Sequence, residues 1–406
     1  MSIITVFAGI YCNEESAIKE ILKKTGYKYL TDADIVSKAG KLSGLSESKV
    51  SKAFSAKTSV FNQMTHEKER SVAYLKLAVA ETLTEDNLLI NGFTSLLIPA
   101  GIAHVLKVCL IADMKYRVSL ASSSGMSESE AVKMIHKSDE DKISWTKSIL
   151  EKDDPWDISI YDMVLPTDKM TPEETADLVE KTLEKDILKA SADSEKAIQN
   201  IILASRVETA LAKEGHFITA EADAGAITLI INKKVLMLKR LEEELQSIAS
   251  KIPGVKSVAT KVGKKFYQAD VYRKYDLEMP SKLLLVDDER KFAQTLSERL
   301  RLREIGSVVA YDGESALDMI KEEEPDVMIL DLKMPGIDGI EVLKRVKQTN
   351  PLIEVIILTG HGSEADKELC MQLGAFAYLE KPVDVNILSE TIKKANEKIK
   401  QSRKNK

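Results

Sequence analysis

The alternation of apolar and polar positions divides the chain into three blocks. In the first block, short apolar runs alternate with stretches whose apolar residues recur at helical spacing. This pattern predicts strands at residues 3–8, 87–90 and 105–111. It predicts helices at 16–24 and 71–83, and another from Met114 onward. Strands that alternate with helices indicate a parallel α/β sheet.

The second block has a different order of elements. Its pattern predicts a helix at 197–213, two strands at 217–222 and 226–231 around a turn, an amphipathic helix at 234–251, and a last strand at 255–262. The order helix, strand, strand, helix, strand predicts a small α+β domain.

The third block contains five strand-helix repeats, which predict a flavodoxin-like (βα)5 domain. The predicted strands lie at 282–286, 307–311, 326–330, 354–358 and 377–379. We therefore expect a multidomain α/β protein with domains at 1–186, 194–265 and 281–399. A linker at 266–280, rich in tyrosine and charge, precedes the last domain.

Composition narrows the class of protein. The net charge of -6 argues against broad non-specific binding of nucleic acid. The three cysteines form no CxxC pair, so a disulfide framework or a zinc site is not expected. No apolar stretch approaches the ~18 residues of a membrane helix, and the N-terminus has no basic leader. We expect a cytoplasmic protein.

Charged residues, and one threonine, follow the predicted strands of the third block. Asp287 and Asp288 follow the first strand, Asp331 the third, Thr359 the fourth and Lys381 the fifth. In an open parallel sheet the carboxyl ends of the strands meet at one edge, where ligands bind. The sequence thus predicts that these side chains form one site.

The residue types at this edge predict phosphoryl chemistry with Mg²⁺. Three neighbouring carboxylates repel one another unless a cation lies among them, and hard oxygen ligands suit Mg²⁺. We expect Asp288 and Asp331 as direct ligands together with the backbone carbonyl of Lys333, and Asp287 nearby or acting through water. Lys381 supplies a positive charge to a phosphoryl group.

Four motifs carry a resemblance to a known family. They are VDDE at 286–289, DLKMPGIDG at 331–339, LTG at 358–360 and LEKP at 379–382. With them, the third block resembles the receiver domain of bacterial response regulators over its whole length. The resemblance implies phosphotransfer from a sensor histidine kinase to Asp331 and slow self-hydrolysis. It also implies a switch in which Thr359 moves toward the phosphoryl group and Tyr378 turns inward.

The first block resembles the cytidylate-kinase-like family of P-loop proteins. The resemblance lies in residues 4–16, 91–118, 130–147 and 156–179. Where that family has a Gly-Gly-Lys phosphate loop, this chain has Asn13, Glu14 and Glu15, and a glutamate has the wrong charge for a triphosphate. Lys137 and Lys142 stand where arginines would be typical, and Arg117 is the remaining candidate for a phosphate contact.

These departures favour a degenerate domain, kept for folding, sensing or dimer contacts, over a working nucleotide kinase. Weak nucleotide binding without catalysis lies between the two hypotheses. A homodimer is also compatible with the sequence.

The second block resembles a BON domain, through residues 207–211, 225–229 and 252–258. The resemblance implies phospholipid or ligand binding, and the alternative is a structural spacer. A basic cluster, formed by Lys233, Lys234, Lys239 and Arg240, is more simply a solvated face than a lipid site.

Three functions are therefore open. The first is a signalling protein, in which phosphorylated Asp331 changes how the receiver packs against the upstream domains or an unknown downstream partner. The chain ends shortly after the last predicted helix and no DNA-binding domain follows, which favours such an output. The second is a nucleotide kinase gated by phosphorylation. The third is a scaffold that docks a kinase or membrane partner.

Overall fold

The computed structural model of the chain consists of two compact units. One unit comprises residues 1–58 and 67–273, and the other comprises residues 59–66 and 274–406. The structure describes residues 2–57, 61–232, 238–263, 266, 282–301, 303, 305–360 and 362–404.

The first unit begins with a five-stranded parallel sheet in the order β2-β3-β1-β4-β5. Its strands are β1 (Ile3–Ala8), β2 (Lys28–Thr31), β3 (Leu88–Asn91), β4 (Val105–Ile111) and β5 (Met163–Pro166). The central strands are buried on both faces, as their continuous apolar runs require.

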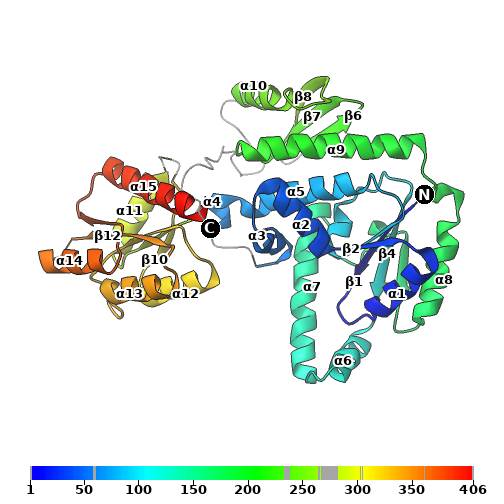
Figure 1. Cartoon of the computed structure of the whole chain (residues 1–406), viewed down its shortest axis with the longest axis horizontal. Helices are drawn as coiled ribbons and strands as arrows, with labels where there is room; N and C mark the ends of the chain where they lie inside the picture. The colour runs from blue at the N-terminus through cyan, green and yellow to red at the C-terminus, as the bar shows by residue number, and fades with distance from the viewer. Residues whose placement is uncertain are drawn as a thin grey trace. The chain divides into compact units, whose positions relative to one another are not determined.

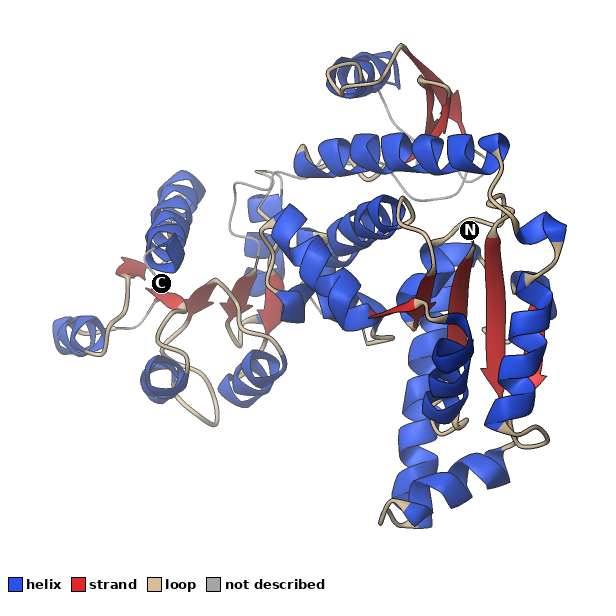
Figure 2. Ribbon diagram, turned by 45° about the vertical axis from the view of Figure 1, so that its right-hand side comes forward, coloured by secondary structure: helices blue, strands red, loops and turns tan. Residues whose placement is uncertain are grey.

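Helices cover both faces of this sheet (Figure 2). They are α1 (Glu14–Thr25), α2 (Asp32–Ser43), α3 (Glu47–Ser51), α5 (Glu67–Thr82), α7 (Glu128–Leu150) and α8 (Pro172–Leu183). Helix α6 (Met114–Ser123) packs against α7. Ile18 of α1 and Val179 of α8 share one core, whereas Ile35 of α2 and Tyr74 of α5 belong to the core on the opposite face.

A three-stranded domain completes the first unit. It is built from α9 (Ala192–Lys213), β6 (Thr219–Asp223), β7 (Ala226–Ile231), α10 (Leu238–Ala249) and β8 (Ser257–Val262). Strand β7 is central, antiparallel to β6 and parallel to β8. The long helix α9 lies along α5 (Figure 1). The predicted order of elements is thus the observed one.

The second unit is a parallel sheet in the order β10-β9-β11-β12-β13. Its strands are β9 (Leu283–Val286), β10 (Val308–Ala310), β11 (Val327–Leu330), β12 (Glu354–Thr359) and β13 (Ala377–Glu380). Its helices are α4 (Asn62–Thr65), α11 (Arg290–Arg301), α12 (Gly313–Glu322), α13 (Gly339–Thr349), α14 (Glu364–Gln372) and α15 (Val385–Lys404). Helices α11 and α15 cover one face of the sheet, and α12 and α13 cover the other (Figure 1).

The predicted multidomain α/β class is confirmed, with strands at 3–8 and 105–111 as expected. Two short strands were missed, β2 and β5, which lie at the edges of the first sheet. Of the expected linker, only Phe266 lies among the described residues, and Lys233 and Lys234 of the basic cluster lie outside them. None of the described helices is long and apolar enough to cross a membrane.

Candidate functional site

The second sheet gathers the predicted site at one edge. Val286 at the end of β9 pairs with Leu330 at the end of β11, so the residues that follow these two strands become neighbours. The backbone N–H of Asp331 donates to the carbonyl of Val286 at 3.0 Å. Parallel pairing therefore places Asp287, Asp288 and Asp331 together, as the sequence predicted.

The three carboxylates form a compact acidic cluster. Each offers one oxygen, and these oxygens lie within 4.8 Å of one another. Asp287 and Asp331 are only 1% and 5% exposed, whereas Asp288 is half-buried. Like charges this close repel strongly at low solvent exposure. The donor set is made of hard oxygens with one side open to solvent, and so fits Mg²⁺.

Lys381 neutralises part of this charge. Its Nζ donates to Oδ2 of Asp287 at 2.7 Å and to Oδ2 of Asp331 at 2.8 Å. Burial alone would lower the pKa of Lys381, but the hydrogen bonds to the two carboxylates outweigh it and raise that pKa. Burial raises the pKa of Asp287, and Lys381 opposes this shift.

Backbone groups fix the orientation of Asp331. Its Oδ1 accepts from the N–H of Leu332 at 2.7 Å and from the N–H of Lys333 at 3.5 Å. Helix α13 begins at Gly339, where a Cβ atom would collide with the carbonyl oxygen of Asp331. Glycine there lets the helix start directly behind the aspartate.

An open cavity of about 670 Å³ lies over the cluster. Its lining residues are Asp288, Glu289, Phe292, Asp331, Lys333, Gly360, Lys381 and Pro382. The ring centroid of Phe292 lies 4.3 Å from Nζ of Lys381, a cation–π distance. Sequence reasoning missed Phe292; the clue was its position one helical turn after Asp288.

Thr359 and Tyr378 lie on the neighbouring strands β12 and β13. Thr359 is 1% exposed, and its carbonyl accepts from the N–H of Lys381 at 2.9 Å. The Tyr378 hydroxyl is buried and has no hydrogen-bond partner among the described residues. The hydroxyl occupies the space where a larger residue than Gly362 would place its Cβ atom. The methyl carbon of Thr359 lies 3.2 Å from the same point, so the two side chains are neighbours. The tyrosine therefore already points toward Thr359.

In the first unit, Arg117 sits beside the loop between β1 and α1. Its Nε donates to the carbonyl of Ile10 at 2.9 Å, and its two terminal nitrogens bind both oxygens of Asp139 at 2.8 Å. Arg117 is 6% exposed and Asp139 is half-buried. Glu15, at the start of α1, is exposed, as is Lys137. The guanidinium is thus engaged by the chain itself.

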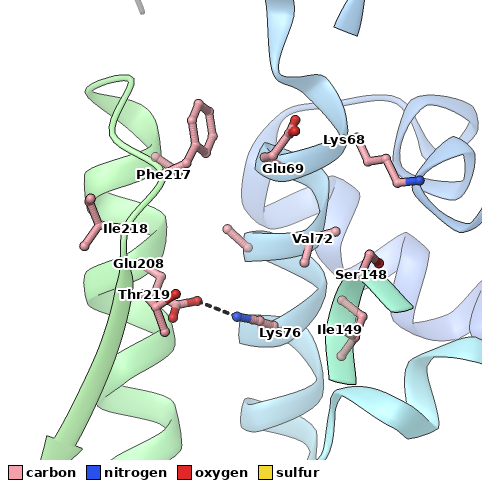
Figure 3. A pocket seen from close by; sticks show the side chains of 12 residues that line it. Lys68, Glu69, Val72, Lys76, Ser148, Ile149, Glu208, Phe217, Ile218 and Thr219 are labelled. Atoms are coloured by element: carbon pink, nitrogen blue, oxygen red, sulfur yellow. Dashed lines mark hydrogen bonds and ion pairs between the residues drawn. The ribbon is translucent and has the colours of Figure 1, made fainter. Parts of the chain in front are cut away.

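A second hollow, of about 360 Å³, lies in the first unit between α5, the end of α7 and α9 (Figure 3). Apolar residues such as Val72 and Phe217 line it together with charged residues such as Lys68 and Glu69. Lys76 and Glu208 point toward each other and form an ion pair of 3.1 Å. The other carboxylate oxygen of Glu208 accepts from the N–H of Ala220 at 3.0 Å. These contacts fasten the three-stranded domain to α5.

Comparison with known proteins assigns both ends of the chain. Residues 283–393 match the response regulator receiver domain, and residues 3–169 match the cytidylate kinase-like family.

Several solved structures similar to this chain are receiver domains of response regulators. One, a response regulator receiver domain protein from Clostridium thermocellum, is 36% identical, with 30% of this chain and 97% of that chain covered and a TM-score of 0.29. A CheY-like receiver domain protein from Methanospirillum hungatei JF-1 is 26% identical, with the same coverage and a TM-score of 0.29. A Francisella response regulator receiver domain is 33% identical, with 29% and 98% covered and a TM-score of 0.28. The two family matches show that the chain carries a response regulator receiver domain in its C-terminal part and a cytidylate kinase-like domain in its N-terminal part.

Proposed function

We propose that this protein is a two-component response regulator that accepts a phosphoryl group on Asp331. The receiver domain implies a histidine kinase as its partner. One observation carries the proposal. Lys381 binds Asp287 and Asp331 at the same time, within a cluster of three carboxylates at the open edge of the sheet.

Asp331 is the carboxylate best placed to attack. It follows β11, which pairs with the strand before Asp287 and Asp288, and one of its oxygens accepts from Lys381. The Leu332 and Lys333 amides hold its other oxygen. A carboxylate oxygen of Asp331 forms the new P–O bond while the P–N bond to the kinase's phosphohistidine breaks and the imidazole leaves. Lys381 then turns from the carboxylates to the phosphoryl oxygens, where its positive charge offsets the added negative charge.

Asp287, Asp288, Asp331 and the backbone carbonyl of Lys333 would hold a Mg²⁺ ion. When bound, that ion neutralises charge on both the attacking carboxylate and the phosphoryl oxygens. The burial of Asp287 and Asp331 supports this assignment, because two buried carboxylates this close need more positive charge than one lysine supplies.

Thr359 and Tyr378 are the proposed switch pair. The Thr359 hydroxyl hydrogen-bonds the phosphoryl group once that group is attached to Asp331. The Tyr378 ring then occupies its inward position, next to Thr359. The inward tyrosine and the space left by Gly362 support this role. The added charge then selects one of two arrangements of these strands.

The signal from the phosphorylated receiver passes to the upstream domains or to an unknown partner. We propose domain boundaries at 1–186, 194–265 and 281–399, a BON-like identity for the second domain, and a cytoplasmic location. The observed αββαβ order supports the BON-like identity, and three buried free cysteines suit a reducing compartment. The Arg117–Asp139 pair disfavours a nucleotide kinase, because Asp139 already binds the cation that would meet a phosphate.

The proposal is tested by exposing the full-length protein to acetyl phosphate with and without Mg²⁺ and measuring its intact mass. We expect the mass of one added phosphoryl group with Mg²⁺, and none in Asp331→Asn. Asp326→Asn, a buried aspartate at the opposite end of β11, is the matched control and should be phosphorylated normally. Equal phosphorylation of Asp331→Asn would refute the assignment.

A further inference from the structure

The hollow between α5 and α9 has room for a small molecule. Its volume of about 360 Å³ falls within the roughly 300–1,000 Å³ of typical ligand pockets. One wall is a single face of α5, along which Lys68, Val72 and Lys76 recur at every fourth position. The facing wall contains Glu208 of α9 and Thr219 of β6 (Figure 3). The N-terminal domain and the three-stranded domain thus form this hollow together, and neither forms it alone.

Half of the residues that line the hollow are apolar. The larger ones include Val72, Ile149 and Phe217, which come from three different segments of the chain. All three side chains are half-buried, so each still exposes apolar surface. An apolar body placed in the hollow would remove that surface from water, which favours binding.

The charged residues of the lining balance one another. They are two lysines and two glutamates, Lys68, Lys76, Glu69 and Glu208, so their formal charges sum to zero. Lys68 points away from α9 and donates to the carbonyl of Ser55 at 3.0 Å (Figure 3). A polyanion such as a nucleotide would therefore meet no excess of positive charge in the hollow.

Lys76 is the polar group best placed to orient a ligand. Its partner Glu208 is 10% exposed and uses both oxygens, one for Lys76 at 3.1 Å and one for the N–H of Ala220 at 3.0 Å. An ammonium has three N–H donors, and Glu208 is the only described residue that accepts from Lys76. The side chain of Lys76 is 34% exposed, so its other donors can bind an acceptor in the hollow. A carboxylate is the acceptor that an ammonium binds most strongly at a single point.

We propose that this hollow binds a small apolar molecule that carries one carboxylate. The carboxylate lies at Lys76, and the apolar body lies against Val72, Ile149 and Phe217. Such a ligand contacts both domains of the first unit and strengthens their association. The inference goes beyond the phosphoryl-accepting role proposed for the receiver, and it holds or fails independently of Asp331.

The test titrates 2-naphthoate, an apolar monocarboxylate, into the full-length chain by calorimetry and compares it with neutral 2-naphthamide, which has the same shape. Wild type should bind the carboxylate at least about tenfold more tightly, because a charge-assisted hydrogen bond is stronger than a neutral one. Lys76→Met should lose this preference while still binding the amide, and Lys76→Arg should keep it. Lys23→Met is the matched control, because Lys23 pairs with Glu20 on the surface of α1 at 3.0 Å. A preference that persists in Lys76→Met, or no binding of either compound by wild type, would overturn the proposal.

Val72→Phe tests the hollow itself and leaves the ion pair of Lys76 and Glu208 in place. The larger side chain should fill the space and weaken the binding of both compounds at least about tenfold, because the apolar body loses its room. This variant also decides the question if Lys76→Met separates α5 from α9 and binds neither compound. Undiminished binding by Val72→Phe would show that the ligand lies elsewhere and would refute the proposal.

Hydrogen exchange locates the bound compound. Saturating 2-naphthoate should slow exchange in peptides from α9 and β6, which form the wall facing α5, because a ligand that binds the folded state stabilises it. Peptides from β9 and β11 of the receiver should be unchanged. Slower exchange in the receiver with no change in α9 and β6 would contradict the assignment.

Discussion

Replacing Lys381 by methionine tests the electrostatics of the receiver site most sharply. The substitution keeps most of the apolar stem and removes the ammonium that binds Asp287 and Asp331 at 2.7 and 2.8 Å. The three side chains are 10%, 2% and 7% exposed, so water replaces little of the lost interaction. We expect the second unit to be clearly destabilised in metal-free solution at neutral pH.

The expected size follows from the burial of the group. Removing one partner of a buried ion pair costs ~3–5 kcal/mol, because the remaining charge is left uncompensated. The cavity over the cluster is open to solvent, so we take about 3 kcal/mol, the lower end of that range. Since each 1.4 kcal/mol is tenfold, backbone amides in β9 and β11 should exchange about a hundredfold faster.

The assay is hydrogen exchange of the full-length chain, read by mass spectrometry on peptides from β9 and β11. This readout separates the second unit from the first, which a whole-chain unfolding curve does not. Lys367→Met is the matched control, because Lys367 pairs with Glu364 on the surface of the same unit and should change nothing measurable. Equal effects of the two substitutions would refute the reasoning.

The same variant has a predicted pH dependence. Burial raises the pKa of Asp287 against the opposing charge of Lys381, so removing the ammonium raises it further. The folded state then holds a proton more tightly than the unfolded state. The penalty of Lys381→Met is therefore largest above that raised pKa and shrinks as the pH falls through it. A penalty that is constant from neutral pH to about pH 4, near the ordinary carboxyl pKa, would contradict this explanation.

Three further predictions concern the same edge of the sheet. Chelating Mg²⁺ should abolish phosphorylation by acetyl phosphate. Saturating Mg²⁺ should slow hydrogen exchange in Lys381→Met more than in wild type, because the ammonium no longer competes with the cation. Equal slowing in both proteins would argue against a shared site. Gly339→Ala should destabilise the second unit by about 1–3 kcal/mol, because its Cβ would collide with the carbonyl of Asp331; exchange rates unchanged from wild type would contradict this. Phe292→Leu should lower the rate of phosphorylation severalfold, because it removes the ring 4.3 Å from the ammonium of Lys381. Phe292→Tyr keeps the ring and should be phosphorylated at the wild-type rate. Equal rates in wild type and Phe292→Leu would show that the ring has no role.

Much of the receiver could be predicted because each local pattern agrees with the fold. Val286, Leu330 and Leu358 end apolar runs, and the next residues carry the charge or hydroxyl that the site uses. Parallel pairing then brings those residues together without further information. Thr359 is a small exception, because it is the last residue of β12 and does not follow it.

The remaining features depend on side-chain geometry that spacing does not contain. The inward orientation of Tyr378 needs the space at Gly362, and the position of Phe292 over Lys381 depends on how α11 packs. Phe292 looks like an ordinary position in the sequence, and Tyr378 was singled out by the family resemblance and not by its spacing. Pattern analysis finds which residues meet at a sheet edge more readily than it finds which rings lie above them.

In the first domain, too, the sequence predicted some features and missed others. The sequence identified Glu15 as the residue of the wrong charge, and Glu15 is exposed, whereas its neighbour Glu14 is half-buried. The Arg117–Asp139 pair joins residues 22 positions apart on two different helices, α6 and α7. Strands β2 and β5 were missed because each has only four residues at a sheet edge.

The central claim is that one particular carboxylate carries the phosphoryl group. Borohydride reduces an aspartyl phosphate to homoserine, so treating the acetyl phosphate-labelled, full-length protein and sequencing its peptides by mass spectrometry locates the acceptor. Our account predicts homoserine at position 331 and unmodified aspartate at 287 and 288. Homoserine at Asp287 or Asp288, with Asp331 intact, would contradict it.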